Sequence, residues 1–315
     1  MRLVFTTAAI MRLLPKWMQK VTYPLLPSYW ETRRHLKRTN RLLSSRIQEI
    51  MEQDEDGTQQ PKGSSIDDAN VLYWLSNAVK EKDHHPDVVS PALLVLALAS
   101  VHTTLSRMVH VLYDVTAAGN SLQEQLITEI ETVSQSDWTA ASYEKLHLLD
   151  SVLRESQRLS PPSTTGMKRV FLESYTFHDG THIPKGTYTC LPIYAIENDK
   201  EHAPQPQEFD GLRSFRVQEQ NKRLHRPSNA VAKELLFATP TETSLQFGYG
   251  KWACPGRFFA SFAIKAVLVK LFSEYEFRFL PNSGRPKNLE FHEFIFPPAS
   301  QRMLVRRKKG ALGPF

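Results

Sequence analysis

The feature that most constrains the fold is a long apolar segment in the first half of the chain, LLVLALASVHTTLSRMVHVLYDV, residues 93–115. Ser90 and Pro91 precede it, and this pair is a typical helix start, because serine accepts free backbone N–H groups and proline loses no hydrogen bond in the first turn. Apolar residues lie nearly all round the first half of the segment. We therefore expect one helix from Ser90 to Gly119 that runs buried through the middle of the protein.

The rest of the sequence predicts more helix than strand. Helical spacing of apolar residues recurs in several segments. The expected helices cover residues 1–50, a short stretch capped by Asp67 or Asp68 and ending at Lys80, residues 121–133, residues 140–159 before Pro161 and Pro162, and residues 255–272. The polar segment 52–66 contains glycine and proline breakers and is expected to form an exposed loop.

Strand signals are concentrated in the second half of the chain. Residues 170–196 alternate in polarity and contain the turn pairs Asp179-Gly180 and Lys185-Gly186, which predicts hairpins. Near the C-terminus, YEFRFLPN, LEFHEFIFPP and RMLVRRKK predict short strands. Residues 197–243 are rich in proline and are expected to form a long irregular connection. The expected fold class is mainly α with a smaller β portion, in a single domain over residues 1–315.

Composition limits the partners and the compartment. The 315 residues include 39 basic and 33 acidic side chains, and the net charge of +6 favours acidic surfaces or anionic lipid headgroups over neutral partners. The sequence contains no zinc-finger spacing and no aromatic RNA motif, so we do not expect it to bind nucleic acid. Cys190 and Cys254 are too few and too far apart for a disulfide framework, which favours a reducing compartment.

The N-terminal region predicts an amphipathic helix rather than a membrane anchor. The apolar run from Leu3 to Met11 is broken by threonines and is shorter than the roughly 20 residues that a membrane span needs. The apolar side of the expected helix carries Leu13, Leu14, Trp17 and Met18. Further along, one solvated face is expected to carry Arg33, Arg34, Lys37 and Arg38, opposite Leu42, Leu43, Ile47 and Ile50.

The segment FGYGKWACPGRFFA, residues 247–260, places Cys254 among Gly248, Gly250 and Gly256. Glycines let the backbone bend tightly, so that a flat and bulky group can approach the sulfur. Free N–H groups at the start of the following helix favour a thiolate. Such a cysteine can be a nucleophile, a redox thiol or a metal ligand, and a small buried apolar residue is the plain alternative.

A second motif pairs an acid with bases. Glu155 and Arg158 are three residues apart on one helix face, where they can form an ion pair. Arg213 follows Pro206 and Phe209 in the proline-rich connection, and it could complete a buried, bidentate network with Glu155 that holds this connection on the helix. The plain alternatives are a surface ion pair and an ordinary loop arginine.

Polar residues also interrupt the long apolar helix. His102, Thr103 and Thr104 lie in the middle of apolar turns. A threonine hydroxyl there either bonds to the carbonyl of the preceding turn or faces a cavity, where it can relay protons. A histidine in such a position is more often a satisfied core residue than a ligand or a base.

Together these motifs resemble the cytochrome P-450 family of haem-thiolate monooxygenases, most closely the fungal enzymes of secondary metabolism. The cysteine loop is similar to the family's Phe-x-x-Gly-x-x-x-Cys-x-Gly pattern, residues 155–158 to its Glu-x-x-Arg helix, and residues 206–213 to its Pro-x-x-Phe-x-x-x-Arg segment. Residues 99–104 correspond to its oxygen-binding helix. The resemblance implies the C-terminal two thirds of the P-450 fold, without the family's N-terminal anchor and first helices.

The resemblance implies a role for each candidate residue. Cys254 would be the thiolate ligand of the iron of haem b, the one metal ligand expected from the chain. Thr103 and His102 would serve proton delivery, and residues 163–167 would line the substrate pocket. The remaining haem-contacting residues would be Phe247, Gly250, Gly256, Trp252 and Arg169, the last toward a propionate. Glu155, Arg158 and Arg213 would hold the structural core.

The resemblance also implies partners and a location. Electrons would come from NADPH through a flavoprotein reductase, docked near Lys251 and Arg257, and the substrate would be a hydrophobic secondary metabolite such as a terpenoid. Relatives lie on the endoplasmic reticulum membrane, so a membrane surface is expected, with the cytoplasm as the alternative for a chain without an anchor. A haem-thiolate isomerase or dehydratase, independent of NADPH, is a further alternative.

The sequence departs from the family pattern at three points. His102 replaces the usual acid before the threonine, and Trp252 replaces the usual arginine or histidine two residues before the cysteine. Only about 87 residues precede the long helix, so the family's propionate-binding N-terminal helix has no counterpart. These departures favour, as the alternative to an active monooxygenase, a truncated and inactive relic that binds haem weakly.

Overall fold

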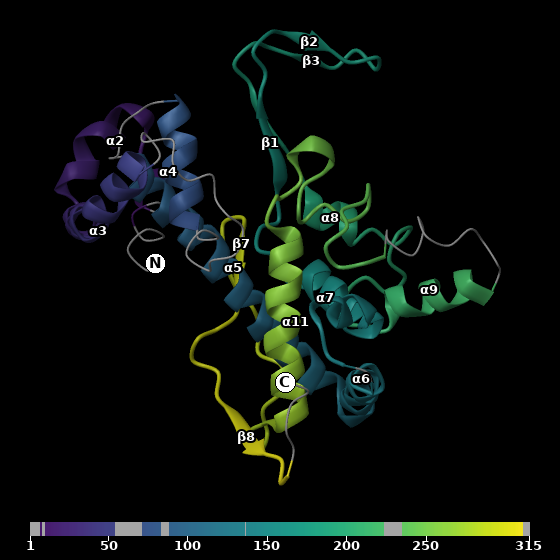
Figure 1. Ribbon diagram of the computed structural model, residues 1–315. Helices are drawn as coiled ribbons and strands as arrows, with labels where there is room; N and C mark the ends of the chain where they lie inside the picture. The colour runs from purple at the N-terminus through teal and green to yellow at the C-terminus, as the bar shows by residue number, and fades with distance from the viewer. Residues whose placement is uncertain are drawn as a thin grey trace. The chain divides into compact units, whose positions relative to one another are not determined.

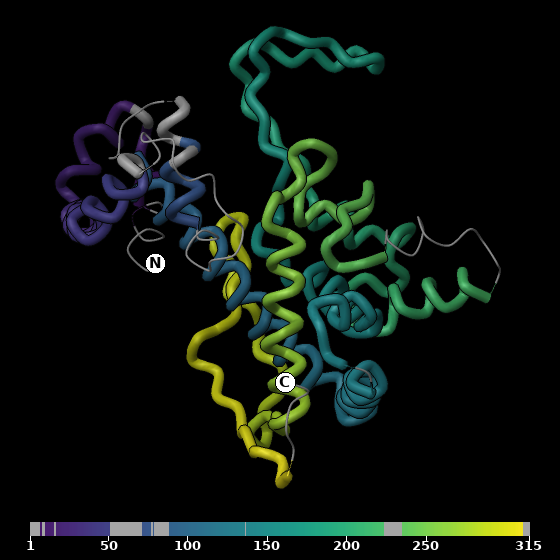
Figure 2. The backbone as a smooth tube through the Cα atoms, in the orientation of Figure 1, coloured from purple at the N-terminus to yellow at the C-terminus, as the bar shows by residue number. Residues whose placement is uncertain are grey.

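The computed structural model describes residues 7, 10–53, 71–82, 88–135, 137–223 and 235–310. The chain divides into two compact units, Met1–Val101 and His102–Phe315. The division falls inside one long helix, and Figures 1 and 2 show the path of the chain through each unit. The predicted fold class, mainly α with a smaller β part, is confirmed.

The first unit is mainly helical in its described part. Its elements before the long helix are α2 (Lys16–Thr22), the 3-10 turn η1 (Tyr23–Leu25), α3 (Pro27–Gln53) and α4 (Val71–Lys82). The prediction of one helical stretch over residues 1–50 was wrong near Pro15, Pro24 and Pro27, because proline lacks the N–H group that would continue the helix. Ile47 and Ile50 of α3 are 1% and 4% exposed, and α3 packs against α4. The expected loop 52–66 and its following cap lie almost wholly outside the described residues.

The long helix α5 covers Val89–Ala118, close to the predicted bounds. Its second half is buried, with Val111 and Val115 at 0% and 1% exposure. The first half was predicted to be buried, and this is wrong: Val95 and Val101 are 65% and 60% exposed, because no described element covers them. Among the described residues, α5 is long and apolar enough to cross a membrane, judged by length and composition alone.

The core of the second unit lies between helices. These are the second half of α5, α6 (Asn120–Val133), α7 (His147–Leu159) and α11 (Arg257–Glu274). Leu126, Leu153 and Leu268 are each fully buried in it, and such burial is the main stabilising contribution to the unit. The predicted helix 140–159 is divided at Leu146 into the 3-10 helix η4 (Ala140–Lys145) and α7.

The proline-rich connection is less irregular than predicted. It contains α9 (Arg213–Arg223), and α8 (Ile193–Glu197) ends where it begins. α9 packs against α7. The expectation of an irregular connection over residues 197–243 is therefore wrong for α9. This helix was missed because its sequence is mostly polar and shows little helical spacing of apolar residues.

The strands form antiparallel pairs, as the alternating segments predicted. β1 (Gly166–Val170) pairs with β4 (Tyr188–Leu191), and β2 (Tyr175–Thr176) with β3 (His182–Ile183). β5 (Tyr275–Phe279) pairs with β8 (Met303–Arg307), and β6 (Leu289–Phe291) with β7 (Phe294–Phe296). Gly180 and Gly186 have φ of 86° and 83°, as the predicted turns require. Figure 1 shows the β2–β3 hairpin projecting away from the helices of its unit.

Candidate functional site

Cys254 lies at the surface, between the 3-10 turn η5 (Gly250–Trp252) and α11. It is a free cysteine, so the alternative of a small buried apolar residue is wrong. Its backbone N–H donates to the carbonyl oxygen of Phe247 at 2.6 Å, which closes the loop. Phe247 in turn packs edge to face against Phe237, with ring centroids 5.2 Å apart, at the border of the apolar core. The thiol is therefore exposed on a loop that is anchored to the core.

Two glycines give the cysteine loop its path. Gly248 has φ of 75°, and a Cβ atom there would lie 2.8 Å from the carbonyl oxygen of Trp252. Gly250 has φ of 59° with open space around it. A Cβ atom on Gly256 would lie 4.0 Å from Sγ of Cys254, so glycine leaves the sulfur uncovered on that side. The loop thus combines a tight backbone with free access to the sulfur.

Cations gather around Trp252 at the edge of this loop. The Trp252 side chain is 64% exposed. The guanidinium carbon of Arg169, from β1, lies 5.1 Å from the centroid of the indole ring, and Nζ of Lys251 lies 5.4 Å from it. Both distances are within the range of a cation–π interaction. Arg257 donates from Nη1 to the carbonyl oxygen of Cys254 at 2.8 Å. These groups make the surroundings of the thiol favourable for anions.

The two residues proposed for proton delivery lie on a different element. His102 and Thr103 are at the start of the second unit, on α5. His102 is half-buried and contacts Phe296 of β7 edge to face at 5.7 Å. Burial lowers the pKa of His102 below its ordinary value, which favours the neutral imidazole. Thr103 is exposed.

The acid–base motif forms a buried network. Nη2 and Nε of Arg158 donate to the two carboxylate oxygens of Glu155 at 2.7 and 2.9 Å, and Nε of Arg213 donates to Glu155 at 3.1 Å. Glu155 is 2% exposed, so this is not the surface ion pair considered as an alternative. The backbone N–H of Asp210 also donates to Glu155 at 3.1 Å. The network therefore holds the segment before α9 on α7.

Further contacts hold the stretch that leads into the cysteine loop. Arg154 of α7 donates from Nη1 to the carbonyl oxygens of Leu236 and Thr239 at 3.1 and 3.3 Å. The carboxylate of Glu197, at the end of α8, accepts the backbone N–H of Leu245. Glu197 is 3% exposed, and burial raises its pKa to about 7. The start of the loop is thus tied to two helices.

Sequence reasoning missed a buried polar cluster between α5 and α7. Asp114 accepts from Oγ of Ser156 at 2.6 Å and from Nε of Arg285. Arg107 donates to Oγ of Ser156 at 3.2 Å and to the carbonyl oxygen of Ser160 at 2.5 Å. These contacts fix the second half of α5 against α7. The available signal was the presence of charged residues among the apolar turns of α5.

A buried ion pair in the helical core was also missed. Nζ of Lys265, on α11, donates to Asp150 of α7 at 2.6 Å and to the carbonyl oxygen of Tyr143 at 2.9 Å. Both charged side chains are 4% exposed. Burial raises the pKa of Asp150, while Lys265 opposes that shift. The pair links the helix after the cysteine loop to the helix of the Glu155 network.

The segment proposed to line a substrate pocket has an unusual backbone. Met167 has φ of 53°, which a non-glycine residue seldom adopts. The register between β1 and β4 is irregular between Gly166 and Arg169, so Met167 lies in this bulge. Ser163 forms an isolated bridge with Phe294 of β7. The segment 163–167 is therefore held between β4 and β7.

The residues present fit a haem-thiolate site. The described residues contain no group of three or more His, Cys, Asp or Glu side chains that could hold a metal ion by themselves. A single exposed thiol is the donor that suits an iron whose other ligands come from a macrocycle. Arg169 and Lys251, beside Trp252, are suited to carboxylates of a bound group. The donor atom of Cys254 and its exposure at the surface therefore both suit a haem iron.

Comparisons with known proteins place these features in a family. The family model described as Cytochrome P-450 matches residues 3–305. The chain is 37% identical to the cytochrome P-450 monooxygenase AN1598 of Emericella nidulans, over 97% of this chain and 55% of that protein. It is 35% identical to the cytochrome P-450 monooxygenase olcJ of Penicillium canescens, over 96% of this chain and 55% of that protein. It is 33% identical to the ent-kaurene oxidase of Fusarium fujikuroi, over 97% of this chain and 55% of that protein. The chain thus spans about 55% of the length of these relatives.

Proposed function

Since the chain belongs to the cytochrome P-450 family, we propose that it is a haem-dependent monooxygenase formed by a single haem-thiolate domain. The observation that carries the proposal is the free thiol of Cys254, exposed on a glycine loop beside the cations held at Trp252. In the overall reaction one atom of O2 enters a C–H bond of the substrate, the other leaves as water, and NADPH supplies two electrons. A bound haem supplies the dioxygen chemistry.

The side chains of this protein bind and orient. Sγ of Cys254 would be the thiolate that holds the haem iron, Phe247 would pack beside it, and Gly250 and Gly256 would leave room for a flat ring. The guanidinium of Arg169, steadied on Trp252, would bind a propionate. The network of Glu155, Arg158 and Arg213 would keep the segment before α9 on α7. This last role is structural rather than chemical.

Proton delivery would depend on α5. Oγ1 of Thr103 would hold and pass on a proton for the water that the reaction forms. His102 would be a neutral donor or acceptor next to it, in keeping with the direction of its pKa shift. A Thr103→Ala variant should divert electrons to hydrogen peroxide, and an unchanged ratio of product to NADPH consumed would remove Thr103 from this role.

Substrate and partners are proposed more broadly. One relative is named ent-kaurene oxidase, and two others are named monooxygenases, all from fungi. We therefore propose a hydrophobic secondary metabolite, a terpenoid or similar compound, as the substrate. An NADPH-dependent flavoprotein reductase would dock at the cations Lys251 and Arg257, which flank the thiol. The endoplasmic reticulum membrane surface would be the location.

The first test is the absorbance spectrum of the purified, haem-supplemented protein, reduced and exposed to carbon monoxide. We expect a red-shifted Soret band of the thiolate type, lost in Cys254→Ala and retained in Cys190→Ala, the matched control at the other exposed free cysteine. Absence of haem uptake would favour an inactive relic that does not hold haem. Turnover that does not depend on NADPH would favour an isomerase or dehydratase.

A further inference from the structure

A cavity of about 260 Å³ lies beside the Glu155 network in the second unit. Its walls come from α7, α8 and the residues after it, the first turns of α9, and the stretch that leads into the cysteine loop. Both α8 and α9 pack against α7, and Figure 1 shows the three helices together. Three arginines of α7 and α9 reach this cavity, which we call the arginine cavity. They are Arg154, Arg158 and Arg213.

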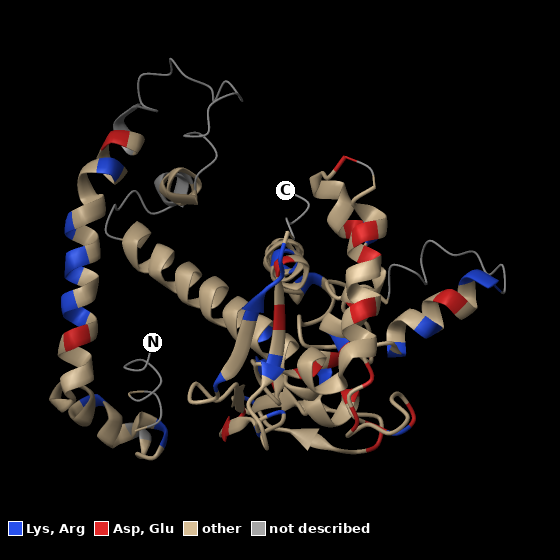
Figure 3. Cartoon of the chain, turned by 90° about the horizontal axis from the view of Figure 1, so that it is seen from below, with Lys and Arg blue, Asp and Glu red and all other residues tan. Residues whose placement is uncertain are grey.

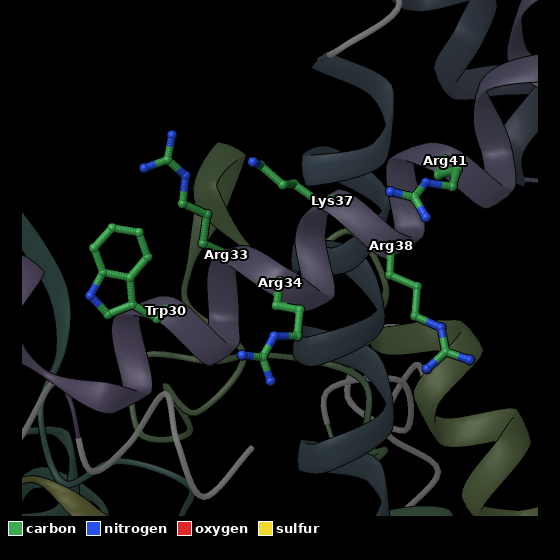
Figure 4. Close-up of a pocket in the computed structure, with 6 residues that line it drawn as sticks. All are labelled: Trp30, Arg33, Arg34, Lys37, Arg38 and Arg41. Carbon is green, nitrogen blue, oxygen red and sulfur yellow. The ribbon is translucent and has the colours of Figure 1, made fainter.

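The arginine cavity differs from a larger basic hollow on the first unit. That hollow, of about 610 Å³, is lined by side chains of α3 alone, and Figure 4 shows them extending from the ribbon around Trp30. Figure 3 shows the cations of α3 as a run of blue bands along one helix. The arginine cavity is instead enclosed by several elements, and the side chains of Arg158 and Glu155 in its wall are 9% and 3% exposed. A ligand there would be held from several sides and largely out of water.

The charged groups around the arginine cavity leave an excess of positive charge. Glu155 accepts hydrogen bonds from both Arg158 and Arg213, so one carboxylate serves two guanidinium groups. The second carboxylate of the walls is Glu197, whose pKa burial raises to about 7, so it is partly protonated at neutral pH. The three arginines therefore face less than two full negative charges. In a partly enclosed site, such an excess favours a bound anion.

Hydrogen-bond donors of the walls also remain available. Arg213 has five N–H donors, and three of them have acceptors among the described residues. One of these three contacts, from Nη2 to the carbonyl oxygen of Glu208, is as long as 3.5 Å. The hydroxyl of Ser214 has no hydrogen-bond partner in the described part of the chain, and the exposed imidazole of His202 adds a further N–H group. Polar oxygen atoms of a ligand could accept from all three side chains.

The volume and the donors of the arginine cavity indicate the class of anion. About 260 Å³ is less than the roughly 300–1,000 Å³ that is usual for sites of organic ligands, so the occupant is small. The guanidinium fork matches the oxygen atoms of carboxylate and phosphate. Here the donors come from separate elements and approach from several directions, which suits tetrahedral oxygens better than a planar carboxylate. Ser214 also lies in the first turn of α9, where free N–H groups and the helix dipole favour negative charge.

We propose that the arginine cavity binds a small tetrahedral dianion, either inorganic phosphate or the phosphate group of a small metabolite. Bound there, the dianion would connect α7 and α9 with the stretch that leads into the cysteine loop, since Thr243 and Ser244 of that stretch also line the cavity. It would thus add to the contacts by which Arg154 and Glu197 already hold this stretch. This binding goes beyond the proposed monooxygenase function and does not depend on it.

The test is equilibrium dialysis of the purified chain against radiolabelled inorganic phosphate at constant ionic strength. We expect saturable binding to the original chain. Ser214→Asp should weaken it by about 10-fold or more, because the new carboxylate repels the dianion and competes for its donors. Ser214→Ala removes one hydroxyl donor alone and should weaken binding by about 2- to 10-fold. Absence of saturable binding to the original chain would overturn the proposal.

The matched control adds the same charge elsewhere on α9. Gln220 is exposed and does not line the arginine cavity, so Gln220→Glu should bind phosphate like the original chain. Circular dichroism verifies that each variant is folded, and Ser214→Ala together with the exchange measurement below decides the question if Ser214→Asp is not. Equal weakening by Ser214→Asp and Gln220→Glu would assign the effect to net charge and overturn the proposal.

Hydrogen–deuterium exchange of the original chain gives the position of the bound anion. With phosphate, the amides of residues 213–217 and 243–245 should exchange more slowly, while those of the distant pair β5 and β8 should not change. Slowing at β5 and β8 without slowing at the cavity would contradict the assignment. Both measurements use the chain without haem, so their outcome is independent of the carbon monoxide spectrum.

Competition distinguishes the two sources of the dianion. Unlabelled inorganic phosphate and glycerol 3-phosphate are compared as competitors for the labelled ion. Stronger competition by glycerol 3-phosphate would support a phosphorylated metabolite as the natural ligand, and stronger competition by phosphate would support the free ion. Equal competition by chloride at the same ionic strength would show unspecific screening and would overturn the site.

Discussion

The guanidinium group of Arg169 lies over the indole ring of Trp252, 5.1 Å from its centroid, although 83 positions separate the two residues. The sequence alone indicated that Trp252 replaces a cationic residue of the family pattern. The structure shows that a cation from β1 lies over the indole ring, so that the tryptophan is its platform. Trp252 therefore supports a charge next to the cysteine loop without carrying one.

The first prediction concerns this platform. A Trp252→Ala variant should bind haem about 2- to 5-fold more weakly, because an exposed cation–π contact contributes about 0.5–1 kcal/mol to holding Arg169 in place. Trp252→Phe, which retains an aromatic ring, should lose less. Titration of the chain with haem, followed at the Soret band, measures both. If Arg169→Ala weakens binding while Trp252→Ala does not, the ring is not a platform.

The second prediction concerns the buried carboxylate of α7. Glu155→Ala should lower the free energy of unfolding by about 3–5 kcal/mol, because Arg158 would be left buried without its partner. Urea unfolding, monitored by circular dichroism, gives this value. Glu144 is exposed, so Glu144→Ala should change it by less than about 0.5 kcal/mol. A loss below about 1 kcal/mol at Glu155 would contradict the role assigned to the network.

The third prediction is a pH dependence of stability. Burial raises the pKa of Glu197 to about 7 in the folded chain, from an ordinary 4.5. The folded state therefore binds this proton more tightly, and its stabilising contribution is fully present below pH 4.5 and is lost as the pH rises through 7. Glu197→Gln keeps an oxygen for the Leu245 N–H but cannot ionise.

We compare the free energy of unfolding of Glu197→Gln with that of the original chain at pH 5 and at pH 8. This difference should be more favourable to the variant at pH 8 than at pH 5, by up to about 3 kcal/mol. The exposed Glu144→Gln should show no such difference. Urea unfolding at the two pH values is the measurement. A larger relative gain at pH 5 than at pH 8 would reverse the sign and refute the assignment.

The fourth prediction concerns the cysteine loop. Gly248→Ala should cost about 1–3 kcal/mol in stability, because the new Cβ meets the Trp252 carbonyl in a backbone region that favours glycine. Gly284 has open space around it, so Gly284→Ala should be nearly neutral. Thermal unfolding compares them. An equal loss of stability in the two variants would mean that the close approach of Gly248 to the Trp252 carbonyl does not require glycine.

Local signals predicted most of the elements and the centres of the motifs. The glycines around Cys254, the spacing from Glu155 to Arg158 and the turn pair at Gly180 depend on neighbouring residues, so a pattern in the sequence is sufficient to find them. Arg213 was also a candidate from its motif, but whether it reaches Glu155 depends on the packing of α9 on α7, which the structure supplies.

Long-range pairings could not be predicted in the same way. Asp150 and Lys265 are 115 positions apart, and each local pattern shows only one charge among apolar residues. A charge on an apolar helix face indicates a buried partner but does not identify it. The exposure of the first half of α5 was missed for a related reason, because periodicity records which residues are apolar but not which element covers them.

The polar contacts of α7 have a consequence for the dynamics of the second unit. Its 13 residues hold α11 through Asp150, the stretch before the cysteine loop through Arg154, and α9 through Glu155. For α7 to open, these distant segments must all detach together. Its backbone amide hydrogens should therefore exchange with solvent deuterium only when the whole unit unfolds, as the slowest group in the protein.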